Sequence, residues 1–471
     1  MKKVVLLLAG VSVLCLMLLS CGGGGSSSSN TSESEDTSLE DTSLVTIGEA
    51  NAENDLIVTE RSREDASSED VAALVTALNE FGLELYKRQA KDDESLSISP
   101  YSISLVISAA SAGSTGQTLE EILSAMQFPT PLNDLHSVFN HLDLEITGNE
   151  SPGKQTPLKS IPSAWGQKGY SVFIDYYNQL AEYYGMSFTG CDFATGTLDA
   201  EGTIELWDNE HSVLGFSDPT GSLSVQTRLV LSNLTSFEAV WDSPFNPDLT
   251  HEDDFIKLNE SKVATSFLSQ EGIFPYAEEN GLQAVEIPFE GGEISVLIIL
   301  PEADEFQTDE NELTALEVQR ILSLLEPTRI LLEIPSFSLD SKYFPKDDLS
   351  VLGMTAAFDK TTADFSGANA EDTMFITRII SQTKHRVNET GWIGETSTHA
   401  MLEGVAVSPN PIGFVDNDYN AILIIMPILE PVITPPPAIT AAFNHPFIYI
   451  IRDVESGTIL FMGRFMEPKS N

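Results

Sequence analysis

Seven histidines are the first residues to consider for metal binding or general-base chemistry: His136, His141, His211, His251, His385, His399 and His445. None recurs with a Cys or a second His at the spacing that a metal site on one helix face requires. The densest cluster, His251-Glu252-Asp253-Asp254, is interpreted as a solvated acidic loop. The chain has no Gly-x-Ser-x-Gly elbow, phosphate-binding loop or dinucleotide fingerprint. We therefore expect no metal, no cofactor and no catalytic residues, although composition alone leaves a Ser-His-Asp triad open.

The charge balance restricts the partners. The 471 residues include 24 Lys and Arg against 71 Asp and Glu, a formal net charge of −47. Such a field repels phosphate backbones and anionic lipid surfaces, so nucleic-acid binding is excluded. Hydrophobic residues make up 42% of the chain, enough for a large buried core. The sequence predicts a folded acidic protein.

The N-terminus has the pattern of an export signal. Met1-Lys2-Lys3 is basic, Val4 to Leu19 is apolar, and Leu18-Leu19-Ser20-Cys21 resembles the bacterial lipobox, in which the Cys is lipidated after cleavage. We interpret residues 1–21 as a lipoprotein signal peptide ending at the lipidated Cys21, with an ordinary secretory signal or a lone membrane helix as alternatives. Gly22 in place of Asp favours an anchor in the bacterial outer membrane, on its cell-surface (extracellular) or periplasmic face.

The remaining chain divides into two parts. Residues 22–66 are small, polar and acidic, without a period that could bury a face, and predict a disordered tether. Residues 67–471 have no second low-complexity break and predict a single domain. Helical periodicity dominates its first part and β-prone runs dominate its second, which together favour an α+β fold. The helices are expected at 71–87, 102–112, 118–126 and 176–184, and the strands at 228–234, 294–300, 330–335, 375–381, 447–452 and 458–465.

Several motifs resemble the serpin family of protease inhibitors, in the family's order and across nearly all of residues 70 to 468. The segment 203–222 departs from the family's usual helix-loop pattern. The motifs are Asn79-Glu80-Phe81, Ser97-Ile98-Ser99-Pro100-Tyr101-Ser102-Ile103, Gly113-Ser114-Thr115-Gly116-Gln117-Thr118, Leu229-Val230-Leu231-Ser232-Asn233, Glu286-Ile287-Pro288-Phe289, Ile334-Pro335-Ser336-Phe337, Ala363-Asp364-Phe365-Ser366-Gly367, Val387-Asn388-Glu389, Asn444-His445-Pro446-Phe447 and Met462-Gly463-Arg464.

The resemblance implies a fold and a mechanism. The fold is a large central mixed β-sheet with two smaller sheets, eight or nine helices and an exposed reactive loop near the C-terminus. The implied activity is that of a monomeric suicide-substrate inhibitor of serine proteases. The protease cuts the loop and forms an acyl-enzyme. The cut loop then inserts into the central sheet as an added strand.

Insertion requires side chains that alternate along the loop. With the hinge starting at Glu389 and Gly391, the inward set is Trp392, Gly394, Thr396, Thr398, Ala400 and Leu402, and the outward set includes Glu395, His399 and Glu403. Thr396 to Leu402 suit a strand that enters a packed sheet. Trp392 departs from the family, in which this position is usually Thr or small, because an indole needs a larger hole. Glu395 is expected to remain in contact with solvent. The substitution Trp392→Thr is expected to increase inhibition.

The resemblance also assigns a sheet-opening polar cluster of Ser99, Ser102, Asn233 and Ser381, with Ser381 where the family has His. The reactive-loop region, residues 389–443, is about twice the family's usual length. Counting forward from the hinge places the scissile bond at Val405-Ala406, and counting backward from His445 places it near Ile433-Thr434. We favour Val405-Ala406, and Val before the bond suits an elastase-like or subtilisin-like protease.

Two functions from different classes remain. The first is an inhibitor of serine endopeptidases, with cysteine proteases as a second target class, that contacts the membrane only through its lipid anchor. The second is a non-inhibitory binding protein of the same fold, or a slow protease substrate, suggested by the atypical hinge at Trp392.

Overall fold

The computed structural model describes residues 43–48, 60–90, 93–128, 132–149, 156–405 and 439–468. Cys21, the rest of the predicted signal peptide, Ala406 and the alternative bond at Ile433-Thr434 lie outside the described residues. Among the residues that are described, no helix combines the length and apolar character needed to cross a bilayer.

The four helices expected from apolar spacing are present, and five more occur in the described residues. Helix α1 (Ser68–Gln89) starts after Ser67, whose side chain accepts a hydrogen bond from the backbone N–H of Asp70. Helix α2 (Pro100–Ser111) is buried along its whole length and is capped by Ser99. The other helices in the described part are α3 (Gly116–Ala125), α4 (Leu132–Ile146), α5 (Ile174–Tyr184), α6 (Thr197–His211), α7 (Phe306–Glu312), α8 (Ala315–Leu324) and α9 (Lys346–Val351).

Three sheets hold the strands. A six-stranded sheet has the order β12 (Phe337–Tyr343), β13 (Met374–Val387), β14 (Gly391–Gly404), β6 (Thr227–Val240), β3 (Leu158–Gln167) and β5 (Phe188–Cys191). A nine-stranded sheet has the order β15 (Ile439–Ala442), β11 (Glu326–Pro335), β8 (Lys262–Glu279), β9 (Leu282–Pro288), β10 (Ile294–Leu300), β16 (Phe447–Asp453), β17 (Ile459–Phe465) and β2 (Leu96–Ile98), with β7 (His251–Ile256) on β8. Strand β1 (Leu44–Thr46) pairs with β4 (Ser171–Phe173). The β3–β5 and β11–β15 pairs are parallel, so both larger sheets are mixed, and the predicted α+β class is confirmed.

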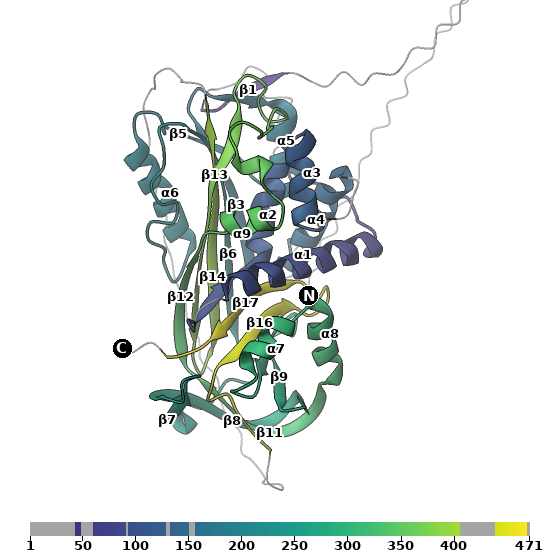
Figure 1. Cartoon of the computed structure of the whole chain (residues 1–471), viewed down its shortest axis with the longest axis vertical. Helices are drawn as coiled ribbons and strands as arrows, with labels where there is room; N and C mark the ends of the chain where they lie inside the picture. The colour runs from purple at the N-terminus through teal and green to yellow at the C-terminus, as the bar shows by residue number, and fades with distance from the viewer. Residues whose placement is uncertain are drawn as a thin grey trace, which may run out of the picture. The chain divides into compact units, whose positions relative to one another are not determined.

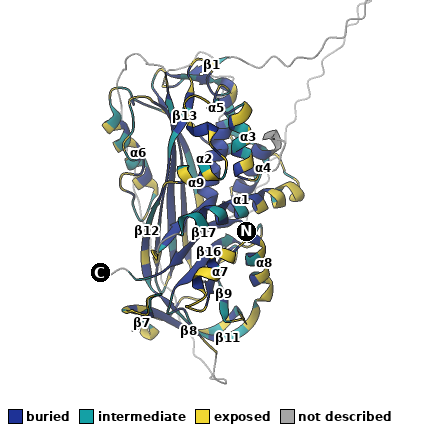
Figure 2. Ribbon diagram, viewed as in Figure 1, coloured by how far each residue is buried: buried dark blue, intermediate teal, exposed yellow. Residues whose placement is uncertain are grey.

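Helices cover both faces of the six-stranded sheet. In Figure 1, α6 lies on one side of the long central strands, and α1 to α5 lie on the other. Helix α2 contacts both β14 and β6. The central strands are buried along most of their length (Figure 2), as expected of a sheet with two covered faces. The main apolar core includes residues of both larger sheets.

Part of the predicted tether belongs to this folded unit. Strand β1 pairs with β4 in an antiparallel register, and Ile47 is 2% exposed within the main apolar core. Farther along, the Nε of Arg61 donates to Asn140 Oδ1 at 3.0 Å, and its guanidinium pairs with Asp143. Residues 43–48 and 60–66 are thus placed against the domain. The polar composition of residues 22–66 did not indicate this packing, because an isolated apolar residue such as Ile47 does not predict a buried segment.

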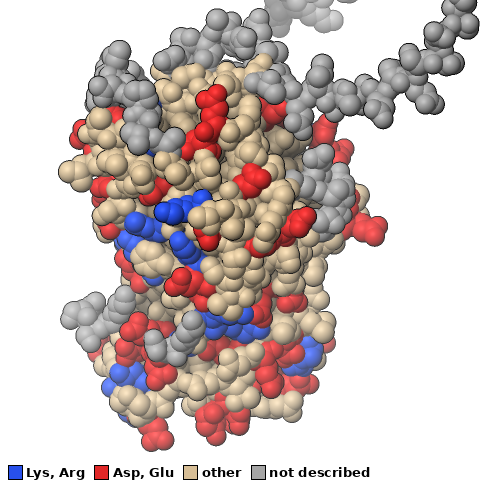
Figure 3. Space-filling model, turned by 45° about the horizontal axis from the view of Figure 1, so that its top comes forward, with Lys and Arg blue, Asp and Glu red and all other residues tan. Residues whose placement is uncertain are grey.

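Two further expectations need correction. His251-Glu252-Asp253-Asp254 opens strand β7 at a sheet edge, where its first three residues are exposed, instead of forming a loop. Residues 391–404 of the expected exposed loop form the buried central strand β14. The outer surface retains the acidic character of the sequence, and one face shows scattered Asp and Glu with a smaller group of Lys and Arg near its middle (Figure 3).

Candidate functional site

Strand β14 is the predicted hinge and first half of the reactive loop. It pairs antiparallel with β13 from Val387↔Trp392 to Met374↔Gly404, and with β6 from Val240↔Gly391 to Thr227↔Glu403. At its base, the backbone N–H of Trp241 donates to the carbonyl of Thr390 at 3.0 Å, and Phe245 N–H donates to the carbonyl of Glu389 at 2.9 Å. The segment is therefore hydrogen-bonded to the sheet on both edges.

The inward face of β14 consists of the predicted residues. Trp392, Ala400 and Leu402 join the main apolar core, and Gly394, Thr396 and Thr398 are buried between them. Gly394 lies opposite His385 in the register, and a Cβ at this position would come within 2.8 Å of His385 Nδ1. A glycine is thus required there because the imidazole occupies the space of a side chain.

Trp392 fits the sheet, contrary to the expected misfit. The side chain is 1% exposed and contacts the rings of Trp241, Phe337, His385 and Tyr449 at centroid distances of 5.1 to 6.2 Å. Its Nε1 donates to His385 Nδ1 at 2.9 Å. The aromatic residues that make this pocket come from β12, β13, β16 and the residue that follows β6, so the sequence around the hinge could not reveal it.

His385 links Trp392 to the neighbouring sheet. Because its Nδ1 accepts from the indole, Nε2 must carry the proton and donate to Ser97 Oγ, 2.7 Å away. Burial lowers the pKa of His385 to about 3, so the ring is neutral at neutral pH. The neutral tautomer is the one that this hydrogen-bond chain requires.

The predicted polar cluster meets β14 through its threonines. Ser102 Oγ donates to Thr398 Oγ1 at 3.0 Å, and Ser381 Oγ lies 3.0 Å from the same hydroxyl. Asn233 Nδ2 donates to Ser102 Oγ at 3.2 Å. Ser99 lies beside them as the cap of α2 and donates to the carbonyl of Leu460. The structure therefore brings the four assigned residues together beneath the middle of β14.

The outward face of β14 is also buried. Glu395, which was expected to be solvated, is 0% exposed. Its carboxylate accepts hydrogen bonds from Ser212 Oγ, from the backbone N–H groups of Val213 and Leu214, and from Ser236 Oγ, at 2.5 to 3.2 Å. Three of these four donors belong to the segment that follows α6. Four donors replace water around the carboxylate, which makes its burial tolerable.

Ser232, His399 and Asp208 form a linked Ser-His-Asp arrangement. Ser232 Oγ lies 2.7 Å from His399 Nδ1, and His399 Nε2 lies 3.0 Å from Asp208 Oδ2. All three are 0% exposed, and Trp165 Nε1 donates to Ser232 Oγ at 3.1 Å. Since His399 belongs to β14, the arrangement exists only with the strand in the sheet. A buried and already hydrogen-bonded serine cannot meet a substrate here, so the geometry argues for a structural role.

The C-terminal end of β14 is held by a buried ion pair. Arg228 Nε donates to Asp372 Oδ2 at 3.0 Å, and the backbone N–H of Val405 donates to Asp372 Oδ1 at 3.0 Å. Gly404 is needed beside this pair, because a Cβ would come within 2.0 Å of Asp372 Oδ2. Val405 itself is 52% exposed. The predicted residue before the scissile bond is thus the first residue to leave the sheet.

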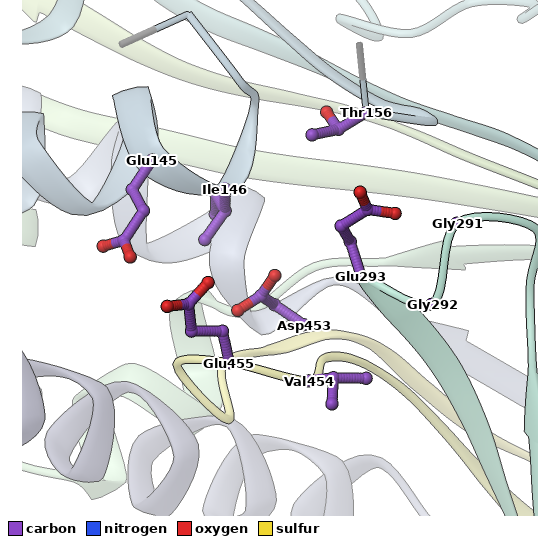
Figure 4. Close-up of a pocket in the computed structure, with 9 residues that line it drawn as sticks. All are labelled: Glu145, Ile146, Thr156, Gly291, Gly292, Glu293, Asp453, Val454 and Glu455. Atoms are coloured by element: carbon purple, nitrogen blue, oxygen red, sulfur yellow. The ribbon is translucent and has the colours of Figure 1, made fainter. Parts of the chain in front are cut away.

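A separate cavity of about 210 Å³ is lined by the carboxylates of Glu145, Glu293, Asp453 and Glu455 (Figure 4). Its lining includes no residue of β14. Within the described ranges, no group of three or more His, Cys, Asp or Glu is arranged to hold a metal ion. Cys191 is buried, and burial raises the pKa of its thiol to about 11, which makes it a poor nucleophile. The cavity therefore lies outside the candidate site, and the thiol packs in the buried apolar cluster that contains Met401.

Sequence comparisons define the class. The family model described as serpin (serine protease inhibitor) matches residues 76–468. An uncharacterized serpin-like protein of Thermococcus kodakarensis is 31% identical over 396 residues, which are 84% of this chain and 86% of the relative. Leukocyte elastase inhibitor of Equus caballus is 27% identical, covering 84% and 99%. Human antithrombin-III is 26% identical, covering 86% and 84%. The chain belongs to the serpin family.

The solved structures that resemble the chain share its fold. A cleaved serpin 42Da has a TM-score of 0.73 at 20% identity, covering 85% of this chain and 100% of that one. A loop-inserted, cleaved ovalbumin mutant has a TM-score of 0.72 at 18% identity, covering 84% and 100%. A thermophilic serpin, tengpin, in the latent state has a TM-score of 0.67 at 19% identity, covering 86% and 100%.

Sequence reasoning missed the residues that cover the outward face. Asp208, Ser212 and Asp372 each bind β14 or its end, yet none belongs to a motif. Asp208 and Ser212 lie in the segment 203–222, which was noted only as a departure from the family pattern. A carboxylate such as Glu395 on a strand that must enter a sheet was the one signal for them, because a buried charge requires partners.

Proposed function

We propose that the chain is a suicide-substrate inhibitor of serine endopeptidases, with cysteine proteases as a second target class. The protease's serine Oγ attacks the carbonyl carbon of Val405 and expels the amine of Ala406, leaving an ester between the two proteins. Residues 391–404 then enter the six-stranded sheet and carry the acylated protease along it. Distortion of the protease's oxyanion hole slows deacylation, because losing one oxyanion donor lowers the rate about 10²- to 10³-fold.

The single observation that carries this proposal is the complete fit of Gly391–Gly404 between β13 and β6. The buried polar side chains on the strand have partners, from Thr398 beneath the sheet to Glu395 above it. Trp392 has an aromatic pocket that only the inserted strand fills. A loop without an insertion role has no need of partners on both faces, so the fit favours inhibition over a purely binding role.

The position of Val405 supports the choice of bond. Insertion of the full strand ends at Gly404, and the exposed Val405 follows directly, where an attached protease could be carried without entering the core. A small apolar residue before the bond suits the pocket of an elastase-like or subtilisin-like protease. We therefore propose Val405-Ala406 as the reactive bond.

Incubation with pancreatic elastase and with subtilisin tests the proposal on denaturing gels. We expect a covalent complex that survives SDS, together with a released fragment beginning at Ala406. Val405→Arg is expected to shift complex formation from elastase to trypsin, whereas Val454→Arg, an exposed control outside the loop, is expected to leave the target unchanged. Complete cleavage at 405–406 without any covalent complex would support the alternative, a non-inhibitory serpin-fold binding protein or slow substrate.

We also propose that Cys21 anchors a monomeric protein to the bacterial outer membrane after export. The basis is the Leu18-Leu19-Ser20-Cys21 motif with Gly22 after it. Metabolic labelling with a fatty acid is expected to mark the wild type, and Cys21→Ser is expected to lose both the label and the membrane fraction. Equal labelling of the two proteins would rule out this anchor.

A further inference from the structure

We propose that Asp208 on α6 is a positioning residue that fixes the final register of the inserted strand β14. The inference rests on the proposed insertion mechanism and goes beyond it, because it assigns register control to a helix outside the sheet. Alternation of side chains and backbone pairing are insufficient to select a single register. The contacts between α6 and the outward face of β14 supply part of the missing discrimination, together with the fit of Trp392 and Gly394 on the inward face.

Asp208 has two side-chain hydrogen bonds, and both go to β14. Ser397 Oγ donates to Oδ1 at 2.9 Å, and His399 Nε2 lies 3.0 Å from Oδ2. Asp208 is 0% exposed in this arrangement, and His399 is held on its other nitrogen by Ser232 of β6. When β14 leaves the sheet, the carboxylate loses both of these partners. Asp208 is therefore specific for the inserted state.

The contacts continue on either side of Asp208. Toward the base of β14, Glu395 accepts from Ser212, Val213 and Leu214, which follow α6. Toward the other end, Met401 belongs to the same buried apolar cluster as Ala200 and Ile204 of α6. As residue numbers increase along β14, the residue numbers of their partners on the α6 segment decrease, so the two segments run in opposite directions. Polar residues of β14 contact polar groups of the α6 segment, and Met401 contacts its apolar residues.

This matching acts against slips that alternation and backbone pairing alone would tolerate. A slip of one residue turns Glu395 and His399 toward the core and is excluded by alternation. A slip of two residues, about 6.6 Å, keeps every side chain on its own face and preserves the backbone ladder. A two-residue slip breaks the outward contacts, and on the inward face it also moves Trp392 from its pocket and brings Trp392 or Thr396 to the site of Gly394, beside His385.

Each two-residue slip moves a carboxylate to an energetically unfavourable site. Displacement in one direction brings Glu395 to the site of Ser397, against the carboxylate of Asp208, where like charges repel in a buried setting. Displacement in the other direction brings Glu403 to the site of Met401, inside an apolar cluster. Asp208 thus favours the observed register both by attraction to His399 and by repulsion of Glu395.

Register can be measured by disulfide trapping. Phe375 and Glu403 are paired across β13 and β14, and both are only partly buried. Phe375→Cys is combined with a Cys at 401, 403 or 405. The 375–403 pair reports the observed register, and the 375–401 and 375–405 pairs report the two slipped registers. The protein is first cut by a limiting dose of protease, and the crosslink yields are read by peptide mapping. This readout needs insertion but no inhibition.

We expect the 375–403 crosslink to dominate in the wild-type background. Asp208→Asn removes the repulsion of Glu395 and weakens the contacts to Ser397 and His399, and because hydrogen bonds to a charged acceptor are stronger than neutral ones, the 375–401 yield relative to 375–403 should rise at least about tenfold. Asp199→Asn, the same change at an exposed position of α6, is the matched control and should leave the yields unchanged. If Asp208→Asn fails to fold, His399→Gln changes the same contact between Asp208 and His399 from the strand side.

The outcomes separate this inference from the proposed function. Unchanged crosslink yields in both Asp208→Asn and His399→Gln would overturn the role of Asp208 while leaving insertion intact. Absence of every 375 crosslink in the wild-type background would instead overturn insertion itself. An altered register in Asp208→Asn with a normal yield of covalent protease complex would confine Asp208 to the register of the end state.

Discussion

Trp392 Nε1 donates a hydrogen bond to His385 Nδ1 at 2.9 Å, joining the first inward residue of the inserted strand to the neighbouring strand β13. The two residues are separated by the hinge, and they meet only when β14 lies beside β13. Because the imidazole also reaches Ser97 on β2, the contact ties the inserted strand to the second large sheet. This relationship changes what substitutions at the hinge are expected to do.

Replacing Trp392 with Thr is expected to destabilise the cleaved protein and to reduce inhibition. The sequence alone predicted a gain of inhibition, but the buried indole fills an aromatic pocket, and removing a buried Trp side chain costs about 3–5 kcal/mol. The cleaved form should unfold at a lower denaturant concentration, and fewer protease molecules should be trapped per inhibitor. Ile393→Thr, at the half-buried neighbour, is the control and should have a smaller effect. Equal stability of wild type and Trp392→Thr would contradict the packing argument.

Adding one methyl group at Gly394 is expected to obstruct insertion. In Gly394→Ala the new Cβ would lie 2.8 Å from His385 Nδ1 and 2.9 Å from Cε1, so the ring must move and lose its hydrogen bond from Trp392. The fraction of protein that is cleaved without trapping the protease should increase. Gly202→Ala on α6, where a Cβ meets no atom within 4 Å, adds the same methyl group harmlessly. Identical partitioning in the two variants would show that His385 yields without penalty.

Acid is expected to destabilise the inserted form through His385. Burial lowers its pKa from 6.5 to about 3, so between these values the unfolded chain binds a proton that the folded chain does not. The contribution of His385 is complete above pH 6.5 and is lost as the pH falls toward 3, at up to about 1.4 kcal/mol per pH unit.

The test compares pH profiles of the free energy of unfolding. His385→Gln should flatten the profile between pH 6 and 4, although it is less stable at pH 7 because it loses the contacts to Trp392 and Ser97. His136, whose pKa burial lowers to about 4, contributes in the same direction and remains in both proteins. The exposed His211→Gln on α6 is the control. Parallel profiles for wild type and His385→Gln would refute the assignment.

The long connection after β14 is expected to permit insertion without cleavage. The structure contains β14 in the sheet and β15 on β11 in one uncut chain, with 34 residues, 405–438, between them. Strand β14 alone spans about 45 Å, and 34 residues can reach at most about 110–120 Å. Prolonged warming of the intact protein should therefore protect the amides of both β14 and β15 from hydrogen exchange.

Deleting residues 411–434 provides the matching test. The ten residues that remain reach at most about 36 Å, less than the length of β14, so the shortened chain can insert β14 fully only by releasing β15 or by being cut. We expect protection of β14 without protection of β15, or no protection of β14, until protease is added. Simultaneous protection of both strands in the uncut deletion variant would show that the length of the connection is irrelevant.

The family, the α+β class and the alternating pattern of the hinge strand could all be predicted from the order of residues along the chain. Motifs such as Asn444-His445-Pro446-Phe447 and the inward series from Thr396 to Leu402 could be recognised because they depend on local order along the chain. The assignment of Ser102, Asn233 and Ser381 to one cluster followed from the resemblance, and Thr398 was found at its centre only in the structure.

The way in which Trp392, Glu395 and Asp208 are accommodated became visible only in the folded protein. Trp392 looked too large and Glu395 too polar, because their partners, Tyr449 for one and the backbone after α6 for the other, lie far away in the sequence. Asp208 had no recognisable role until α6 was placed over β14. Burial energies depend on which distant groups fill a pocket or donate to a charge, and that information exists only once the sheet and its covering helix are assembled.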